Sequence, residues 1–124
     1  MGLGIVEYVL DTNAALYFLG GRLAAPLPDG SYVVSVITEL ELLAYSDITA
    51  EEEAGIQAFL GDVQIAGLTK SVKTNAIDLR RRFRLRLPDA IIAATAISRD
   101  AVLLTNDQKI ISVDTIRTQT LKLK

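Results

Sequence analysis

The side chains in this chain that are best suited to chemistry are oxygen donors. Its 124 residues include neither cysteine nor histidine, which excludes thiolate and imidazole metal sites, cysteine nucleophiles and Ser-His-Asp triads. Four carboxylates stand out because each lies at the boundary of a predicted helix or strand: Asp11, Glu41, Asp89 and Asp107. Carboxylates that converge without partners repel one another, so such a set usually holds a cation. Ligands that are all oxygen favour Mg²⁺ or Mn²⁺.

The elements that must position these carboxylates alternate along the chain. Apolar runs predict buried strands over residues 5–10 and 31–37 and further strands over 63–68 and 101–105, and a weaker pattern predicts an edge strand over 115–121. Helices are predicted between them, with caps at Thr12 or Asn13, at Thr38, at Thr49 and at Thr69. Alternating strands and helices imply right-handed crossovers and a parallel sheet. We therefore expect one domain over residues 1–124, a three-layer α/β/α sandwich with a mostly parallel sheet of about five strands.

The stretch from Leu85 to Ser98 predicts the central helix of this domain. Pro88 suits the start of a helix because it has no N–H to donate, and it places Asp89 in the first turn. Residues 90–97 leave almost no polar face, which indicates a buried helix. Alone, Asp89 would be interpreted as a carboxylate that interacts favourably with the helix dipole.

Topology favours a second interpretation, in which the four carboxylates converge. Ligands of parallel sheets bind beyond the carboxyl ends of the strands, near the point where strand order reverses. Asp11 and Asp107 follow predicted strands, Glu41 lies in the first turn after the second strand, and Asp89 begins a helix that must lead back to the fourth strand. Glu39 competes with Glu41, but residues two apart on a helix point about 200° apart, so only one can face the site.

Four short motifs resemble those of PIN-domain nucleases, and most closely those of VapC-type toxin ribonucleases. They are Asp11-Thr12-Asn13, Ser35-Val36-Ile37-Thr38 followed by Glu41-Leu42, Leu87-Pro88-Asp89-Ala90-Ile91-Ile92-Ala93-Ala94, and Thr105-Asn106-Asp107. The resemblance spans nearly the whole chain and favours Glu41 over Glu39. It departs at Lys109-Ile110-Ile111, where many relatives carry a further acid and an aromatic residue.

The resemblance implies hydrolysis of RNA by Mg²⁺ or Mn²⁺ bound to Asp11, Glu41, Asp89 and Asp107, and a cognate antitoxin as protein partner. A homodimer is a further assembly that the sequence leaves open. Asn13 and Thr105 are expected to hold carboxylates by hydrogen bonds. Two alternatives remain: a Mg²⁺-binding receiver-like signalling module, which the lack of an aspartate at the end of the third strand weakens, and a non-catalytic PIN-like interaction domain.

The charge distribution is compatible with an RNA substrate. The chain has 15 acidic and 13 basic residues, which gives a net charge of −2. If a metal neutralises the four candidate ligands, 11 acidic residues (15 − 4) remain against 13 basic ones. Five arginines precede Asp89, and of these we expect Arg82, Arg84 and Arg86 to contact RNA. The alternative is a solvated helix end. No apolar run approaches the roughly 20 residues of a membrane span, and no signal peptide is evident, so we expect a cytoplasmic protein.

Overall fold

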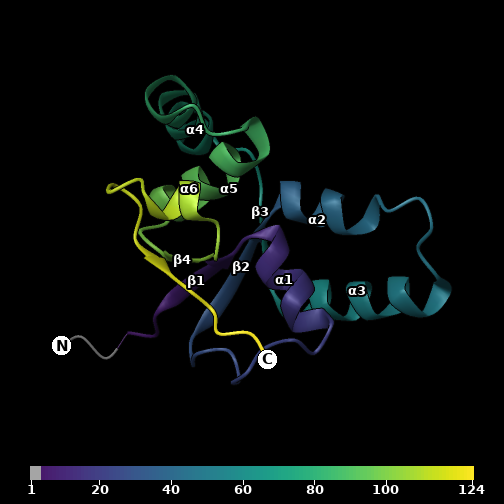
Figure 1. Ribbon diagram of the computed structural model, residues 1–124. Coiled ribbons are helices and arrows are strands. Elements are labelled where there is room, and N and C mark those ends of the chain that lie inside the picture. The colour runs from purple at the N-terminus through teal and green to yellow at the C-terminus, as the bar shows by residue number, and fades with distance from the viewer. Residues whose placement is uncertain (1–3) are drawn as a thin grey trace.

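Five parallel strands form the sheet at the centre of the computed structural model, which describes residues 4–124 (Figure 1). The strands are β1 (Glu7–Leu10), β2 (Ser31–Ser35), β3 (Gln64–Ala66), β4 (Val102–Leu104) and β5 (Thr118–Gln119). They lie in the order β3-β2-β1-β4-β5, and every neighbouring pair is parallel. The chain proceeds outward from β1 to β3 and then returns to β4 on the other side. Strand order therefore reverses between β1 and β4.

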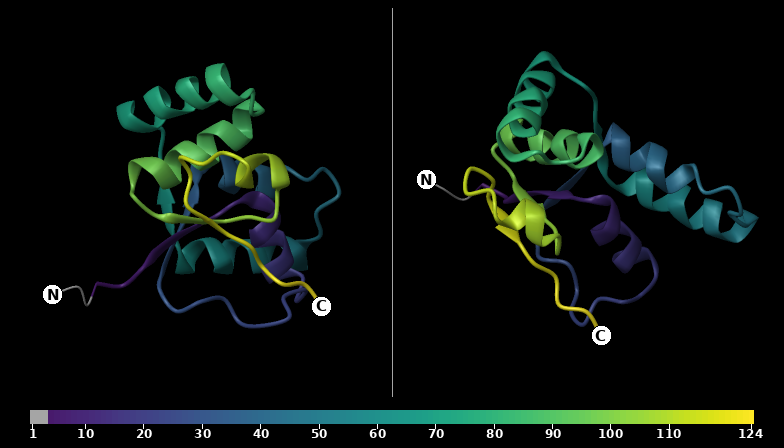
Figure 2. Two further views of the ribbon diagram at one scale, coloured as in Figure 1. Left: turned by 60° about the vertical axis from the view of Figure 1, so that its left-hand side comes forward. Right: turned by 45° about the horizontal axis from the view of Figure 1, so that its top comes forward.

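Six helices in the part of the chain that the structure describes complete the fold and confirm the predicted three-layer sandwich. They are α1 (Thr12–Leu19), α2 (Val36–Leu43), α3 (Ala50–Asp62), α4 (Lys70–Phe83), α5 (Leu87–Ser98) and the single turn α6 (Gln108–Ile111). Helix α5 lies on one face of the sheet with α4 packed over it, and α1 and α3 lie on the other side (Figure 2). None of the helices within residues 4–124 is long and apolar enough to span a membrane.

Two hydrophobic cores follow from the alternation of side chains along the strands. In β1, Val9 packs into the core under α4 and α5, whereas Tyr8 and Leu10 pack against α1, α2 and α3. The prediction of a buried central helix is confirmed, because the side chains of α5 from Ala90 to Ala96 are buried except for the partly buried Ile91. Helix α5 thus fixes its own first turn against the sheet.

Two helix starts differ from the sequence-based prediction. Helix α1 is capped by Asp11, whose Oδ1 accepts a hydrogen bond from the Ala14 amide at 2.7 Å, and not by Thr12 or Asn13. Helix α2 begins at Val36 with Ser35 as its cap, so Thr38 lies inside the helix and opens no capping box there. In each case an earlier residue with an oxygen-bearing side chain is already extended and takes the cap.

The remaining boundaries are close to those predicted. The capping box of Thr49 and Glu52 is present, Thr69 caps α4, and Asp78 pairs with Arg82 on that helix. Proline 88 is the second residue of α5 and not the first. The predicted edge strand over 115–121 is reduced to Thr118–Gln119, because only these residues pair with β4.

Candidate metal and active site

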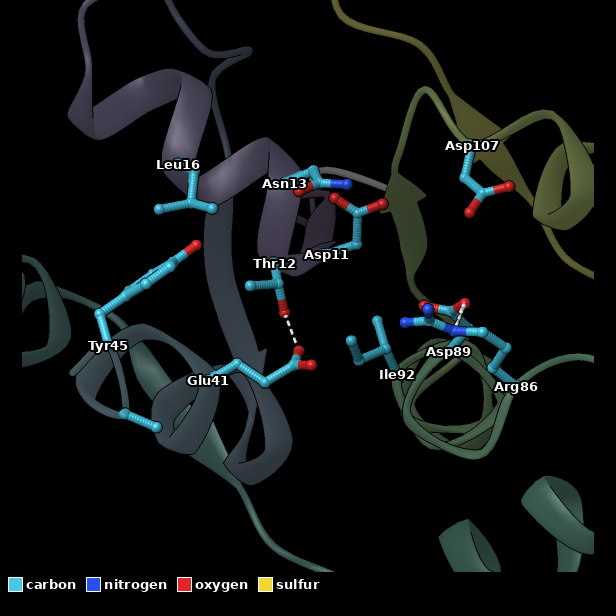
Figure 3. Close-up of a pocket in the computed structure, with 11 residues that line it drawn as sticks. Asp11, Thr12, Asn13, Leu16, Glu41, Tyr45, Arg86, Asp89, Ile92 and Asp107 are labelled. Atoms are coloured by element: carbon cyan, nitrogen blue, oxygen red, sulfur yellow. Dashed lines mark hydrogen bonds and ion pairs between the residues drawn. The ribbon is translucent and has the colours of Figure 1, made fainter. Parts of the chain in front are cut away.

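The four predicted carboxylates line one open pocket of about 410 Å³ at the carboxyl edge of the sheet. Figure 3 shows their side chains around a shared space between α1, α2, α5 and the segment that precedes α6. The pocket therefore lies where strand order reverses, between β1 and β4. Glu39 is not among the lining residues, so the choice of Glu41 agrees with the geometry.

Asp11 is the most buried of the four carboxylates, with 6% of its surface exposed. Its two oxygens accept hydrogen bonds from the Ala14 amide and from the Thr105 hydroxyl. Burial raises the pKa of Asp11 above its ordinary value of 3.8 despite these hydrogen bonds, and the negative charges of Asp107 and Asp89 raise it further. A cation in the pocket would favour the charged form that burial and repulsion oppose.

Asp89 occupies the first turn of α5, as predicted, with about a quarter of its side chain exposed. Burial raises its pKa above 3.8, and the charges of Asp107 and Glu41 act in the same direction. The Arg86 guanidinium opposes this rise in pKa, with its Nε 3.5 Å from Oδ2 of Asp89. Asp89 is thus more than a carboxylate at a helix start, because other acids lie close enough to affect its charge.

A pair of threonines holds Glu41. The Thr12 hydroxyl donates to Oε1 of Glu41 at 2.6 Å and lies 3.1 Å from the hydroxyl of Thr38, which is fully buried. Because a hydroxyl has one proton, Thr12 must accept from Thr38 when it donates to Glu41. Sequence reasoning missed this chain of hydrogen bonds by treating both threonines as caps. One feature of the sequence could have indicated it: Thr38 and Glu41 are three residues apart and therefore share a helix face.

Thr105 joins the two aspartates that follow β1 and β4. Its hydroxyl donates to Asp11 and accepts from the Asp107 amide at 3.1 Å, so its predicted role as a hydrogen-bonding neighbour of the carboxylates agrees with the structure. Asp107 in turn caps α6 through the Lys109 amide at 2.9 Å. Asn106, which was not predicted, binds the backbone of Leu121 through both side-chain atoms at 2.7 and 2.9 Å and so ties this loop to the tail.

Asn13 and the three arginines that were expected to contact RNA do not all lie at the pocket. Asn13 lines the pocket, but within residues 4–124 its side chain makes no hydrogen bond to a carboxylate. Of the three predicted RNA contacts only Arg86 lines the pocket. Arg82 pairs with Asp78 at 3.2 Å. Arg84 closes α4 in a left-handed conformation, with its carbonyl bound by the Lys109 ammonium at 3.0 Å.

The donor set fits a hydrated hard cation. Within residues 4–124, no three acidic side chains are arranged to hold one ion directly. Each carboxylate oxygen has two lone pairs, so the oxygens of Asp11 that accept one hydrogen bond still have one to offer. Mg²⁺ usually keeps several waters and uses only one or two protein carboxylates directly. The pocket therefore suits an ion held partly through water.

The parallel α/β/α sandwich with acidic residues at the switch point defines a class of proteins with a polar ligand site at the carboxyl edge of the sheet. A model of the PIN domain matches residues 8–116. The chain belongs to the PIN domain family, which confirms the predicted resemblance. A search of curated proteins finds no match.

Solved structures with the same fold include three toxin–antitoxin assemblies. VapBC2 from Rickettsia felis, bound to a DNA fragment from its promoter, is 19% identical with a TM-score of 0.79, covering 94% of this chain and 100% of that one. A toxin–antitoxin complex from Klebsiella pneumoniae is 26% identical with a TM-score of 0.73, covering 88% and 94%. VapBC-1 from nontypeable Haemophilus influenzae is 23% identical with a TM-score of 0.74, covering 93% and 98%.

Proposed function

We propose that this chain is a metal-dependent endoribonuclease that hydrolyses RNA phosphodiester bonds. The observation that carries the proposal is the convergence of Asp11, Glu41, Asp89 and Asp107, from four separate segments, on one pocket. Membership of the PIN domain family supports it. The raised pKa values of Asp11 and Asp89 support it as well, because shifted carboxylates in a cleft are typical of functional sites.

In this proposal Asp11, Asp89 and Asp107 hold Mg²⁺ or Mn²⁺ directly or through water, and Glu41 is a further ligand or orients the attacking water. When bound, the ion supplies a more acidic water and positive charge near the leaving oxygen. The protein supplies orientation: Thr12 fixes the carboxylate of Glu41, and Thr105 fixes that of Asp11. Such hydrogen-bonding neighbours usually contribute 10–100-fold to metal affinity or activity.

We further propose that the chain is the toxin of a toxin–antitoxin pair. The solved assemblies described above support this, and so does a second cavity of about 580 Å³ beside α1 and α3. Its apolar lining includes Leu16, Leu19, Tyr45, Ile48 and Ile56, and its acidic rim includes Asp47, Glu51 and Glu52. Leu16 and Tyr45 line both cavities, so an apolar, basic segment bound here reaches the carboxylates. A homodimer stays a prediction.

Two measurements on the purified chain test the nuclease proposal. Millimolar Mn²⁺ should raise the melting temperature by mass action and should support cleavage of a fluorescently labelled single-stranded RNA. Asp89→Asn is the control, with cleavage lost in both Mn²⁺ and Mg²⁺. Binding of Mn²⁺ without cleavage of any RNA would favour the non-catalytic alternative, and a melting temperature indifferent to Mn²⁺ would contradict the metal site.

A further inference from the structure

Helix α4 presents a row of cations that the candidate active site does not use. Lys70, Lys73, Ile77 and Arg81 recur at intervals of three and four residues, so they share one face of the helix; Arg84 follows just beyond the helix end, and all five residues are exposed. We call this face, together with Arg84, the α4 stripe. The opposite face of α4, with Val72, Ala76 and Leu79, is buried against α5. The stripe therefore points away from the core.

Helix stability explains only part of the α4 stripe, because the helix dipole favours Arg81 in the last turn and does not favour the two lysines. Within residues 4–124, ion pairs form at Arg82, Arg86, Arg99 and Arg117, and none forms at the four cations of the stripe. Lys70 and Lys73 lie in the first turns of α4, where the helix dipole disfavours positive charge, and that part of the helix has no acidic residue to offset it. These charges cost stability where they are, which indicates a use outside the fold.

The α4 stripe leads directly away from the acidic pocket. Helix α4 ends at Phe83, and residues 84–86 connect it to the first turn of α5, which carries Asp89. The Lys109 ammonium, from the element that follows Asp107, binds the Arg84 carbonyl and adds a further cation at this junction. From there the 14 residues of α4 extend about 20 Å along the outside of the molecule (Figure 2).

We propose that the α4 stripe is the track on which single-stranded RNA lies as it leaves the site of cleavage. The inference rests on the proposed nuclease function and adds the path of the substrate. Unpaired cations about one helical turn apart suit a polyanion with regularly spaced charge. The stripe holds a single apolar side chain, Ile77, which is too little for a protein interface with an apolar centre. Contacts of this kind are to phosphates, so binding is expected to be insensitive to base sequence.

The test compares two double charge reversals of equal size. Lys73→Glu with Arg81→Glu alters the α4 stripe, and Lys122→Glu with Lys124→Glu alters the C-terminal tail, far from α4 in Figure 1. Each variant is titrated in EDTA with a labelled single-stranded RNA of about 12 nucleotides. The stripe variant should bind at least tenfold more weakly, with a log–log salt slope shallower by about 1.4, since each lost phosphate contact contributes about 0.7. The tail variant should bind as the parent does.

Cleavage with Mn²⁺ then separates the track from the site. The stripe variant should have a lower kcat/KM on the 12-nucleotide RNA and an unchanged one on a trinucleotide too short to reach Lys73. Three results would overturn the track. They are an equal loss of kcat/KM on both RNA substrates, an unchanged RNA affinity of the stripe variant, and displacement of RNA by polyglutamate as readily as by unlabelled RNA. The milder Lys73→Gln with Arg81→Gln gives an intermediate effect if the reversal misfolds.

The two proposals fail in different ways. If the parent cleaves no RNA but binds it through the stripe in EDTA, the nuclease proposal fails and the α4 stripe remains an RNA surface. If the parent cleaves RNA and the stripe variants bind normally, the track fails and the nuclease proposal stands.

Discussion

Two regions of the chain on either side of the pocket have opposite charge. Residues 31–69, which form β2, α2, α3 and β3, contain seven acidic residues and neither lysine nor arginine. Residues 70–86, which form α4 and the turn after it, contain seven lysines and arginines and one acid. The first region contributes Glu41 to the pocket and the second contributes Arg86. The net charge of −2 therefore hides a change of sign across the site.

This difference indicates which partner each region can accept. A polyanion is attracted to the α4 side and repelled by the α3 side, and a basic protein segment has the reverse preference. Both surfaces lead to the same carboxylates. On the α3 side, Tyr45 lines both the second cavity and the acidic pocket, and on the α4 side, Arg86 lines the acidic pocket. Under the proposals above, a basic partner bound beside α3 would place its cation where the metal and the substrate phosphate must meet.

The strongest test of this comparison removes one carboxylate from the pocket between the two regions. Asp89→Asn should lower RNA cleavage by more than the roughly 10–100-fold typical of a hydrogen-bonding neighbour, because it removes a proposed ligand. In EDTA the variant should be at least as stable as the parent, since repulsion from Asp107 and Glu41 is relieved. Chemical denaturation and a cleavage assay measure both quantities. A variant that is destabilised and fully active would refute the assignment.

A smaller loss is expected when a positioning hydroxyl is removed. Thr12→Val deletes the 2.6 Å hydrogen bond to Glu41 and keeps the shape of the side chain. Affinity for Mn²⁺ or kcat should fall by about 10–100-fold. Thr12→Ser is the matched variant, because it restores the hydroxyl and should recover most of the loss. Equal activity of the valine and serine variants would show that Glu41 needs no partner on α1.

The charge contrast itself can be examined one residue at a time. Arg84→Gln should make the salt dependence of RNA binding shallower by about 0.7 in log–log slope, the value of one phosphate contact on a single strand. Arg82→Gln should change it less, because Asp78 already pairs with Arg82. Glu53→Gln on α3 should leave the slope as it is. Changes in slope of equal size and opposite sign for Arg84→Gln and Glu53→Gln would show that only net charge matters.

The sequence predicted those parts of the fold that depend on local pattern. Thr49 and Thr69 cap their helices as expected, and the apolar stretch after Pro88 is the buried α5. The convergence of Asp11, Asp89 and Asp107 was also predictable, since each follows a strand end or begins a helix and the crossover rule places these points at one edge. Glu41 was expected in the first turn of its helix and lies further along it, because α2 begins at Val36.

What the sequence could not show are contacts between distant segments. Thr12 and Thr38 are 26 residues apart in the sequence, and their hydroxyls meet because α1 and α2 pack side by side. No periodic pattern in the sequence predicts a contact over that separation. The caps were misplaced because Asp11 and Ser35 each have a second use as a residue at a strand end, and one sequence cannot rank two adjacent candidates.

The smallest expected effect is on how stability depends on pH. Burial raises the pKa of Asp11 and of Asp89 above 3.8, so between 3.8 and the raised values the folded protein binds more protons than the unfolded chain. The free energy of unfolding of the metal-free protein therefore falls as the pH rises through this interval. Other groups act oppositely: the pKa of Glu52 is lowered by its hydrogen bonds with Thr49, so its contribution is lost as the pH falls.

Comparing the parent with Asp89→Asn cancels these other groups. The variant lacks one of the two acids with raised pKa values, so its stability relative to the parent should grow as the pH rises above 3.8 and become constant once Asp89 is fully ionised in the parent. Urea denaturation in EDTA at a series of pH values measures this difference. A difference that shrinks as the pH rises would show that Arg86 stabilises the Asp89 carboxylate more than burial and the acidic neighbours oppose it. The contrast between the regions would then hold within the pocket as well, with the basic side dominating.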